Sequence, residues 1–495
     1  MSNEKQPLKR LTARALKWNV IDRVASQILY AVTGIVLARE LSQEAFGTVG
    51  ALLVFQAFAL LFVDSGFSYA LIQRKRPTET DYSSVLWFNL LIAVAIYIIL
   101  WFSAPLIAEL FGGNDEMVPL SRVMFLTFII NAAAIVQTNR LMKQMNVRPI
   151  ALINALALAA GGVAGIWLAV TGAGAWAIVW QSITINTVKT GGLWIYCRWM
   201  PQFKLSMRSV RSLFRVGGSM MLTSFLNTLF INIYSFIIGN RAGLVPLGYY
   251  SQSDKWSKLG ITSVTQVLTS SFLPALSEVQ DDAERYRRMV RKMNRFTAYL
   301  LFPAMLFLLV AATPIFHVLF GEKWDPSVIL FQILLIRGIF TVLNTLYNNY
   351  MLSLGHSRPI FRLELLRDVV AAAGIAVTFP FITISTPSNI VAGLEILLWG
   401  QLAASFITWI VTLIVTSGIT SIPVTAYLRD IAPYFILAAV ISLCVYTLQW
   451  FITSDAWLLV ARLTTATALY IGANALLPSK IQREVFSYIM PHKKQ

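Results

Sequence analysis

The chain is poor in the residues that build redox and metal sites. Among its 495 residues there are two cysteines, Cys197 and Cys444, and three histidines, His317, His356 and His492. The cysteines lie far apart in the sequence and predict no disulfide framework. No group of His, Cys and acidic residues has the spacing of a metal site. We therefore expect neither a metal ion nor another cofactor.

Catalytic signatures are missing as well. The sequence has no Walker-type glycine-rich loop that would cradle a nucleotide phosphate, which argues against direct ATP hydrolysis. The segments between apolar stretches are short, and none is long enough to hold a nucleophile and its general base. We expect that the protein is not an enzyme.

Charge is scarce and apolar residues abound. Only 13% of residues are charged, against about 25% in a typical soluble domain, while 57% are hydrophobic. Apolar stretches of about 20 residues, long enough to span a bilayer, recur along the whole chain. The pattern predicts an all-α polytopic membrane protein with about 14 transmembrane helices. Their expected positions are 18–38, 45–64, 84–108, 118–139, 149–170, 173–197, 214–238, 248–275, 296–318, 327–352, 360–383, 390–416, 431–453 and 456–477.

The net charge of +17 would suggest nucleic acid as the partner of a soluble protein, but its distribution points to a membrane. The basic clusters fall at the termini and in every second gap between the expected helices, and the other gaps are poor in Lys and Arg. This positive-inside bias predicts a multi-pass protein of the bacterial cytoplasmic (inner) membrane with both termini in the cytoplasm. The basic N-terminus leads into a long apolar span without a cleavage site, so we expect a retained first helix.

Three short motifs recur in register and predict an internal repeat. The recurring pairs are Arg148–Ile150 with Arg358–Ile360 at an offset of 210 residues, Leu110–Gly112 with Leu319–Gly321 at 209, and Ala45–Gly47 with Pro246–Gly248 at 201. Each copy contains six expected helices. An even number gives both copies the same orientation in the membrane, so we predict two parallel six-helix repeats, an architecture common among transporters.

The repeat and the charge pattern together predict the organisation of the chain. The expected segments are a cytoplasmic tail at 1–17, a first half at 18–197, a basic cytoplasmic linker at 198–213, a second half at 214–416, two additional C-terminal helices at 431–477 and a cytoplasmic tail at 478–495.

Polar stripes on the expected helices predict which faces avoid lipid, because a polar side chain in hydrocarbon must meet protein or water. The clearest stripe is in the tenth helix, where Arg337, Thr341, Asn344 and Asn348 share one face. The residues 210 positions earlier form a second stripe in the fourth helix, namely Thr127, Asn131, Ala134 and Thr138. Arg337 is expected near mid-membrane, where a charge needs a partner or a function. The structural alternative is a buried pair with a neighbour such as Glu395 or with a helix-end carbonyl.

Further stripes supply the remaining candidates for a substrate path. The eighth helix carries Lys255 and Lys258 on one face with Asp254 beside them, so that Asp254 neutralises one lysine and leaves the other for an anionic substrate. Snorkelling of both lysines to the interface is the alternative. The first helix offers Arg23 and Gln27, with Asp22 as a structural partner for Arg23, and the seventh offers Asn227. Asp64 and Asp254 are the candidates for ion coupling.

With these features in place, the chain resembles a Wzx-type polysaccharide flippase of the MOP exporter superfamily. The likeness covers essentially the whole chain and is carried by Leu37–Leu41 leading to Ala45–Gly47, by Phe62–Lys75 and by Leu319–Trp324. It implies two six-helix halves that form a V-shaped cleft, lined by the first, second, seventh and eighth helices. It also implies a lipid-linked oligosaccharide as substrate, for lipopolysaccharide, capsule or exopolysaccharide synthesis.

The resemblance implies a mechanism that suits the stripes. The diphosphate-sugar headgroup of an undecaprenyl-linked oligosaccharide cannot cross hydrocarbon, whereas its polyprenyl tail can remain in lipid. A cleft lined by Arg23, Lys255 and Lys258 would neutralise the diphosphate while rocking halves expose it to each leaflet in turn. A polysaccharide polymerase and a chain-length regulator are the protein partners that such a function implies.

Two other functions remain open. A drug or organic-cation exporter of the same superfamily, coupled to Na⁺ or H⁺, would need carboxylates within the membrane, whereas the charge expected there is mostly basic. A membrane glycan polymerase would need a large outer loop with catalytic residues, and the longest outer loop expected here has about ten residues.

Overall fold

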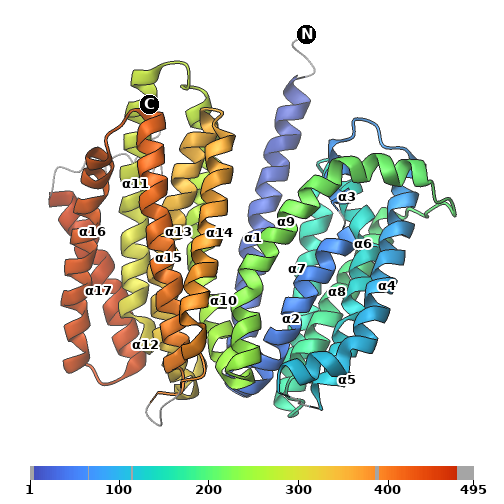
Figure 1. Cartoon of the computed structure of the whole chain (residues 1–495), viewed down its shortest axis with the longest axis horizontal. Coiled ribbons are helices and arrows are strands. Elements are labelled where there is room, and N and C mark those ends of the chain that lie inside the picture. The colour runs from blue at the N-terminus through green and yellow to red at the C-terminus, as the bar shows by residue number, and fades with distance from the viewer. Residues whose placement is uncertain (1–4, 65, 113–114, 385–388, 477–495) are drawn as a thin grey trace, which may run out of the picture. The chain divides into compact units, whose positions relative to one another are not determined.

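The computed structural model describes residues 5–64, 66–112, 115–384 and 389–476 (Figure 1). The described residues form helices and no β-strand, which confirms the all-α prediction. They divide into two compact units, Met1–Gly248 and Tyr249–Gln495. The predicted tail at 478–495 lies outside the described residues.

The first unit is a bundle of helices that run roughly alongside one another (Figure 1). Its helices are α1 (Lys5–Glu40), α2 (Gln43–Asp64), α3 (Phe67–Gln73), α4 (Glu79–Leu110), α5 (Met117–Met124), α6 (Leu126–Lys143), α7 (Val147–Val170), α8 (Trp176–Cys197) and α9 (Met207–Arg241). Helix α9 packs on α2, α3 and α4 and so belongs to this unit by its contacts. The division of the chain into sequence repeats, which places α9 in the second half, stays a prediction.

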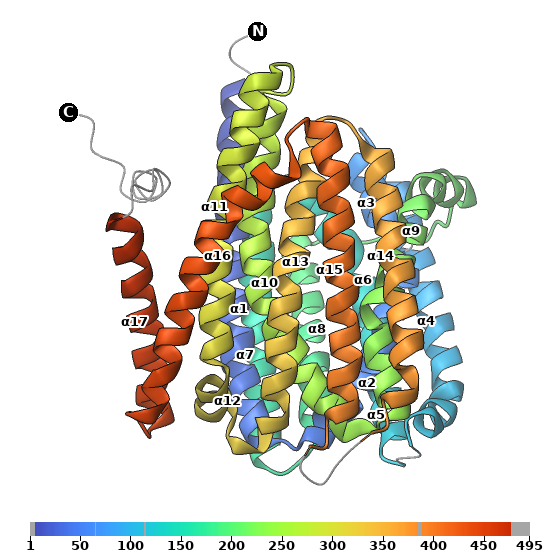
Figure 2. The same cartoon turned by 60° about the vertical axis from the view of Figure 1, so that its left-hand side comes forward.

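The second unit is also a helical bundle, in which α13 packs on α11 and α15, and α16 packs on α11 (Figure 2). Its helices are α11 (Ala283–Val310), α12 (Ala312–Phe320), α13 (Asp325–Ser353), α14 (Ser357–Thr378), α15 (Ala392–Thr420), α16 (Val424–Tyr446) and α17 (Asp455–Leu476), together with most of α10 (Leu244–Ser277). Short 3₁₀ turns occupy Glu322–Trp324, Phe379–Phe381 and Thr447–Trp450.

Every stretch that the sequence predicts to cross the membrane is helical over most of its described length. Ten of the described helical segments are long and apolar enough to do so. The protein is therefore a multi-pass membrane protein, while the count of about 14 stays a prediction. Two expected single helices are interrupted: 118–139 breaks at Phe125, between α5 and α6, and 296–318 breaks at Ala311, between α11 and α12.

The break at Ala311 has a covalent cause. Pro314 has no N–H to donate to the carbonyl of Val310 four residues earlier. That carbonyl instead accepts a hydrogen bond of 2.9 Å from Nη1 of Arg462 on α17. Arg462 is 3% exposed and also donates to the carbonyl of Tyr446 at the end of α16. A buried guanidinium thus satisfies the backbone at two helix ends and holds α17 in the second unit.

Glycine brings α7 close to both of its neighbours. A Cβ added to Gly161 would lie 2.3 Å from the side chain of Ile185 on α8, and one added to Gly162 would lie 2.4 Å from Thr33 on α1. Gly165, one turn after Gly161, faces α8 in the same way. Small residues at this spacing allow helix backbones to approach closely within a membrane, where packing replaces the hydrophobic effect. The sequence thereby fixes α1, α7 and α8 as one layer of the first unit.

The backbone repeats wherever the sequence motifs recur. Helix α6 ends and α7 begins 210 residues before the matching ends of α13 and α14. In the two connecting turns, Met145 (φ 54°) and Gly355 (φ 78°) occupy matching positions, and both adopt the left-handed conformation. Gly112 and Gly321 likewise end their helices at positive φ, each after a buried phenylalanine. The backbone thus adopts similar turns at positions related by the sequence offset, even where the residues differ, as at Met145 and Gly355. This similarity is consistent with the predicted repeat.

Candidate functional site

The two lysines of α10 differ in their partners. Nζ of Lys258 lies 2.5 Å from a carboxylate oxygen of Asp254, one helical turn earlier. Lys255 is exposed, and it has no carboxylate partner among the described residues. Its Nζ lies 5.7 Å from the ring centroid of Trp256, a weakly favourable cation–π distance. Asp254 therefore neutralises one lysine, as the sequence suggested, and Lys255 is the one left with a free charge.

Hydrogen bonds fix the helix that carries these lysines. Ser253 is fully buried and its hydroxyl donates to the carbonyl of Ser327 at the start of α13, at 2.8 Å. The hydroxyl of Ser327 donates in return to the carbonyl of Tyr249 on α10, at 3.1 Å. Further along, Gly338 of α13 accommodates the side chain of Ile261. These contacts hold α10 on α13 and set the direction in which its polar face points.

The polar face of α13 borders a small cavity inside the second unit. The cavity has a volume of about 90 Å³, room for a few water molecules. Its lining is formed by α13, α14 and α15 and consists mostly of hydroxyl, amide and charged groups: Thr341, Asn344, Thr345, Asn348, Leu363, Glu364, Arg367, Ser405, Thr408 and Thr412. We call it the polar cavity. The Oδ1 atoms of Asn344 and Asn348 are buried there without a hydrogen-bond partner among the described residues.

An ion pair on α14 borders the polar cavity. Arg367 contacts Glu364 at 2.6 Å and Asp368 at 2.9 Å, and the amide of Asn348 donates to Glu364 at 3.3 Å. One guanidinium thus faces two carboxylates, which leaves this cluster with a net negative charge. Arg367 holds the two carboxylates together through its guanidinium, a role that was not predicted from the sequence.

Arg337 lies one turn before Thr341 on the same helix and is half-buried. Its Nε has no hydrogen-bond partner among the described residues, and the described part of the chain offers it no ion pair. Glu395, the alternative partner suggested by the sequence, instead accepts a hydrogen bond of 2.8 Å from Asn389. A charge near mid-membrane costs about 2.5–3.5 kcal/mol on insertion scales, so Arg337 keeps its status as a candidate for substrate contact.

In the first unit, α1 presents Arg23 on its exposed face and Gln27 half-buried one turn later. The structural alternative for Arg23 was a pair with Asp22. The carboxylate of Asp22 instead accepts a hydrogen bond of 2.9 Å from Asn154 on α7, and Ser26 joins the same cluster. Within the described residues Arg23 has no ion pair, so its charge remains available.

Asp64 serves a local structural role in the first unit. It ends α2, and its carboxylate accepts hydrogen bonds from the backbone N–H and the hydroxyl of Ser68, at 3.3 and 2.6 Å. The Ser68 hydroxyl accepts in turn from Asn139 on α6, at 2.9 Å. The carboxylate therefore caps the first turn of α3 and ties it to α6. Asn227, the candidate on α9, lies exposed.

More than half of the chain matches a known protein family. Residues 36–329 match the model of a family described as "Polysaccharide biosynthesis protein". The chain belongs to this family. The match covers more than half of the chain, and it confirms the family-level prediction made from the sequence motifs.

Relatives of this chain come from several bacteria. The succinoglycan biosynthesis transport protein ExoT of Rhizobium meliloti (strain 1021) is 27% identical over 74% of each chain. The teichuronic acid biosynthesis protein TuaB of Bacillus subtilis (strain 168) is 23% identical over 93% of each chain. The lipopolysaccharide biosynthesis protein WzxC of Escherichia coli (strain K12) is 25% identical over 67% of this chain and 68% of its own.

Solved structures show the fold of this family member. The lipid II flippase MurJ, in an inward closed conformation, aligns with a TM-score of 0.73 over 96% of this chain and 99% of its own, at 14% identity. An inward-facing multidrug resistance MATE transporter of the MOP superfamily aligns with a TM-score of 0.60 over 81% of this chain and 99% of its own, at 18% identity. At these identities both likenesses concern the fold alone.

The sequence analysis missed Asn154 and Arg367. Asn154 is a lone polar residue in the apolar stretch of α7, and this isolation was the available signal. Its partner cluster also includes Lys189 on α8, which interacts electrostatically with Asp22. No signal in the sequence points to this interaction, because Asp22 lies on α1 and is distant in sequence from Lys189.

Proposed function

We propose that this protein translocates an undecaprenyl-diphosphate-linked oligosaccharide from the cytoplasmic to the periplasmic leaflet. Three relatives are named for the synthesis or transport of surface glycans, namely succinoglycan, teichuronic acid and lipopolysaccharide. The lipid II flippase shares its fold. In this proposal the two predicted repeats work by alternating access, so that the headgroup path opens to each leaflet in turn.

The observation that carries the proposal is the unpaired Lys255 beside the paired Lys258. Because Lys255 is exposed and has no carboxylate partner among the described residues, its charge is available to an anionic ligand. A diphosphate group supplies that anion. Arg23 and Arg337, which also have no ion pair among the described residues, extend the same preference for negative charge.

Neutral polar groups complete the proposed headgroup path. Gln27, Asn227 and Asn344 provide amides that donate to and accept from sugar hydroxyls. Lys258 and Arg337 act with them in this proposal, Lys258 through its pair with Asp254. For ion coupling, Asp254 and Asp64 remain the candidates, although the first is engaged in an ion pair and the second in a helix cap.

The proposal includes a setting for the protein. Both termini face the cytoplasm in the inner membrane, and the protein acts as a transporter rather than an enzyme. A polymerase and a chain-length regulator receive its product on the periplasmic side. These statements rest on the positive-inside pattern and on the functions for which the relatives are named.

The test is to delete the gene in its native host and to measure lipid-linked oligosaccharide together with surface polysaccharide. We expect undecaprenyl-diphosphate glycan to accumulate and the surface polymer to disappear. Wild-type protein and the Lys255→Arg variant restore the polymer, whereas Lys255→Ala and the Lys255→Ala/Lys258→Ala pair do not. A normal lipid-linked pool with an intact surface coat would contradict the proposal and favour a drug or organic-cation exporter, which dye efflux assays would then reveal.

A further inference from the structure

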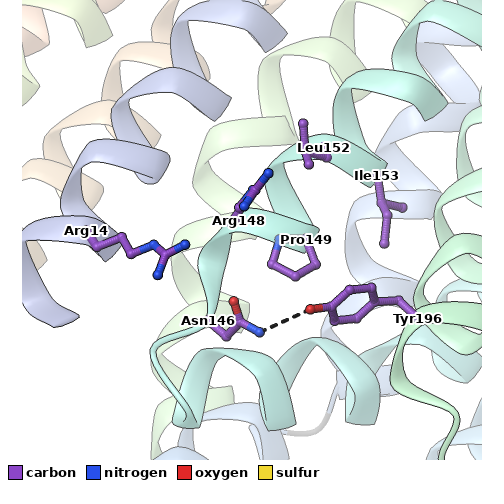
Figure 3. Close-up of a pocket in the computed structure, with 7 residues that line it drawn as sticks. All are labelled: Arg14, Asn146, Arg148, Pro149, Leu152, Ile153 and Tyr196. Atoms are coloured by element: carbon purple, nitrogen blue, oxygen red, sulfur yellow. Dashed lines mark hydrogen bonds between the residues drawn. The ribbon is translucent and has the colours of Figure 1, made fainter.

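A second polar site lies at one end of the first unit, outside the stripes that define the headgroup path. The start of α7, the end of α8 and the early part of α1 enclose a pocket of about 450 Å³ there (Figure 3). This volume is within the range of small-ligand sites. We call it the end pocket.

Two arginines supply the charge of the end pocket. Arg14 extends from α1 toward the start of α7, where Arg148 stands (Figure 3). Among the described residues that line the pocket none is acidic, and neither arginine has an ion pair in the described part of the chain. Arg148 lies over the ring of Trp18, at 5.5 Å from the centroid. Stacking of this kind orients a guanidinium while leaving its N–H groups available.

Polar and apolar groups share the rest of the lining. The amide of Asn146 donates to the hydroxyl of Tyr196 at 3.4 Å, and the two side chains point toward each other in Figure 3. Pro149, Leu152 and Ile153 form an apolar wall along the first turns of α7. Because α7 is a candidate membrane span from Val147 onward, this wall runs from the end of the helix into its apolar length.

We propose that the end pocket binds the phosphate-bearing headgroup of a membrane lipid. Two guanidiniums without carboxylates match one diphosphate or a pair of phosphodiesters, since Arg N–H groups bind phosphate oxygens in a bidentate manner. The hydroxyl of Tyr196 adds a neutral donor. The apolar wall lies against the lipid chain, so the site selects a lipid over free phosphate.

A diffuse basic surface would not produce these features. Positive-inside residues attract anionic lipid without a preformed cavity and without a fixed number of bound molecules. The internal repeat supplies a matched control. Arg358 is the second residue of α14, as Arg148 is of α7, and both side chains are exposed to solvent. If lipid binds in the end pocket, replacing Arg148 weakens binding and replacing Arg358 does not. If lipid binds to a diffuse basic surface, the two replacements have the same effect.

The experiment is native mass spectrometry of the purified full-length protein titrated with dioleoyl phosphatidylglycerol, tetraoleoyl cardiolipin, undecaprenyl diphosphate and, as a phosphate-free control, dioleoylglycerol. We expect a saturable complex with at least one phosphate lipid and none with dioleoylglycerol. Arg14→Ala and Arg148→Ala each weaken it about tenfold or more, and Arg148→Lys weakens it less. Arg358→Ala leaves it unchanged, and unaltered melting temperatures show that the variants are folded.

The lipid that binds most tightly identifies the source of the phosphate. Preference for undecaprenyl diphosphate marks the pocket as a docking point for the substrate carrier, and preference for phosphatidylglycerol or cardiolipin marks it as a phospholipid site. The assay measures binding without transport, so its result stands apart from the proposed flippase activity. Equal weakening by Arg14→Ala, Arg148→Ala and Arg358→Ala, or no weakening by any of them, would overturn the inference.

Discussion

Replacing Lys255 by alanine should separate transport from stability. Lys255 has neither a carboxylate nor a hydrogen-bond partner among the described residues, so its replacement leaves none of them without a polar partner. We therefore expect the free energy of unfolding to change by no more than about 0.5 kcal/mol, as at other exposed sites. A charge-assisted hydrogen bond to diphosphate is worth about 1.5–3 kcal/mol, which corresponds to roughly a 10- to 150-fold loss in headgroup affinity.

Lys258 and Asp254 provide the internal comparison. Their contact of 2.5 Å joins a lysine side chain that is 43% exposed to a carboxylate that is 15% exposed. Solvent screening limits such a pair to about 0.3–1 kcal/mol, so Lys258→Ala should lower stability slightly. In an Asp254→Asn background Lys258 becomes a free cation one turn from position 255. The transport defect of Lys255→Ala should then shrink, because Lys258 takes over part of the contact with the diphosphate.

The assay pairs thermal melting of each purified variant with its initial rate of lipid-linked oligosaccharide transport at low substrate concentration. Lys255→Arg is the control that keeps the charge. A loss of stability above about 1.5 kcal/mol in Lys255→Ala would show that the lysine has a structural partner and would refute the reasoning. So would a Lys255→Ala protein that transports at the wild-type rate. Loss of transport in Asp254→Asn with unchanged headgroup binding would instead assign Asp254 to ion coupling.

Three further predictions concern the helix junctions. Arg462→Met should lower the free energy of unfolding by about 1–3 kcal/mol and the melting temperature with it, because the carbonyls of Val310 and Tyr446 at two helix ends lose the buried guanidinium that donates to them; an unchanged melting temperature would contradict this. Burial lowers the pKa of His317, but hydrogen bonds to Asp455 and Asp325 outweigh burial and raise it. Thermal stability should therefore fall as the pH rises above the ordinary histidine pKa of about 6.5, and His317→Gln should abolish that slope. Gly217→Ala should cost about 1–3 kcal/mol because its Cβ would lie 2.5 Å from the carbonyl oxygen of Gly66, whereas Gly191→Ala, with open space around it, should be neutral.

The helix junctions at the recurring motifs are the local features that the sequence signals most clearly. A turn that needs a left-handed residue and a helix start that tolerates proline impose local requirements, so both leave a mark in the sequence. Gly355 and the motif at Arg358–Ile360 show this clearly, and the structure gives their partners at Met145 and Arg148–Ile150 the same conformation. The interruption at Ala311 was missed, although Pro314 was a visible signal for it.

Pairing between distant helices could not be predicted in the same way. The stripe on α10 correctly suggested that Asp254 neutralises a lysine, because the two residues are one turn apart. The partners of Asp22 and Glu395 lie outside the turn that carries each carboxylate, and the expected pairs with Arg23 and Arg337 do not form within the described residues. Helical periodicity fixes which residues share a face, but the neighbour that a face meets depends on tertiary packing.

The end pocket shows the same limit. Arg14, Arg148 and Tyr196 belong to three different helices, and in the sequence each is indistinguishable from an ordinary basic or interfacial residue. They meet because glycines on α7 allow α1 and α8 to pack closely against it. A positive-inside pattern predicts the sign of the charge at this end of the bundle. It does not distinguish a cavity from a surface.

Transport of the lipid-linked oligosaccharide by the purified protein is the most direct test of the central claim. The protein would be reconstituted into liposomes whose inner leaflet carries undecaprenyl-diphosphate oligosaccharide, and the glycan that reaches the outer leaflet would be cleaved by an added glycosidase. The account predicts that wild-type and Lys255→Arg proteins expose the glycan well above the rate in protein-free liposomes, and that Lys255→Ala exposes it roughly tenfold or more slowly. Exposure at the protein-free rate by a folded wild-type protein would contradict it.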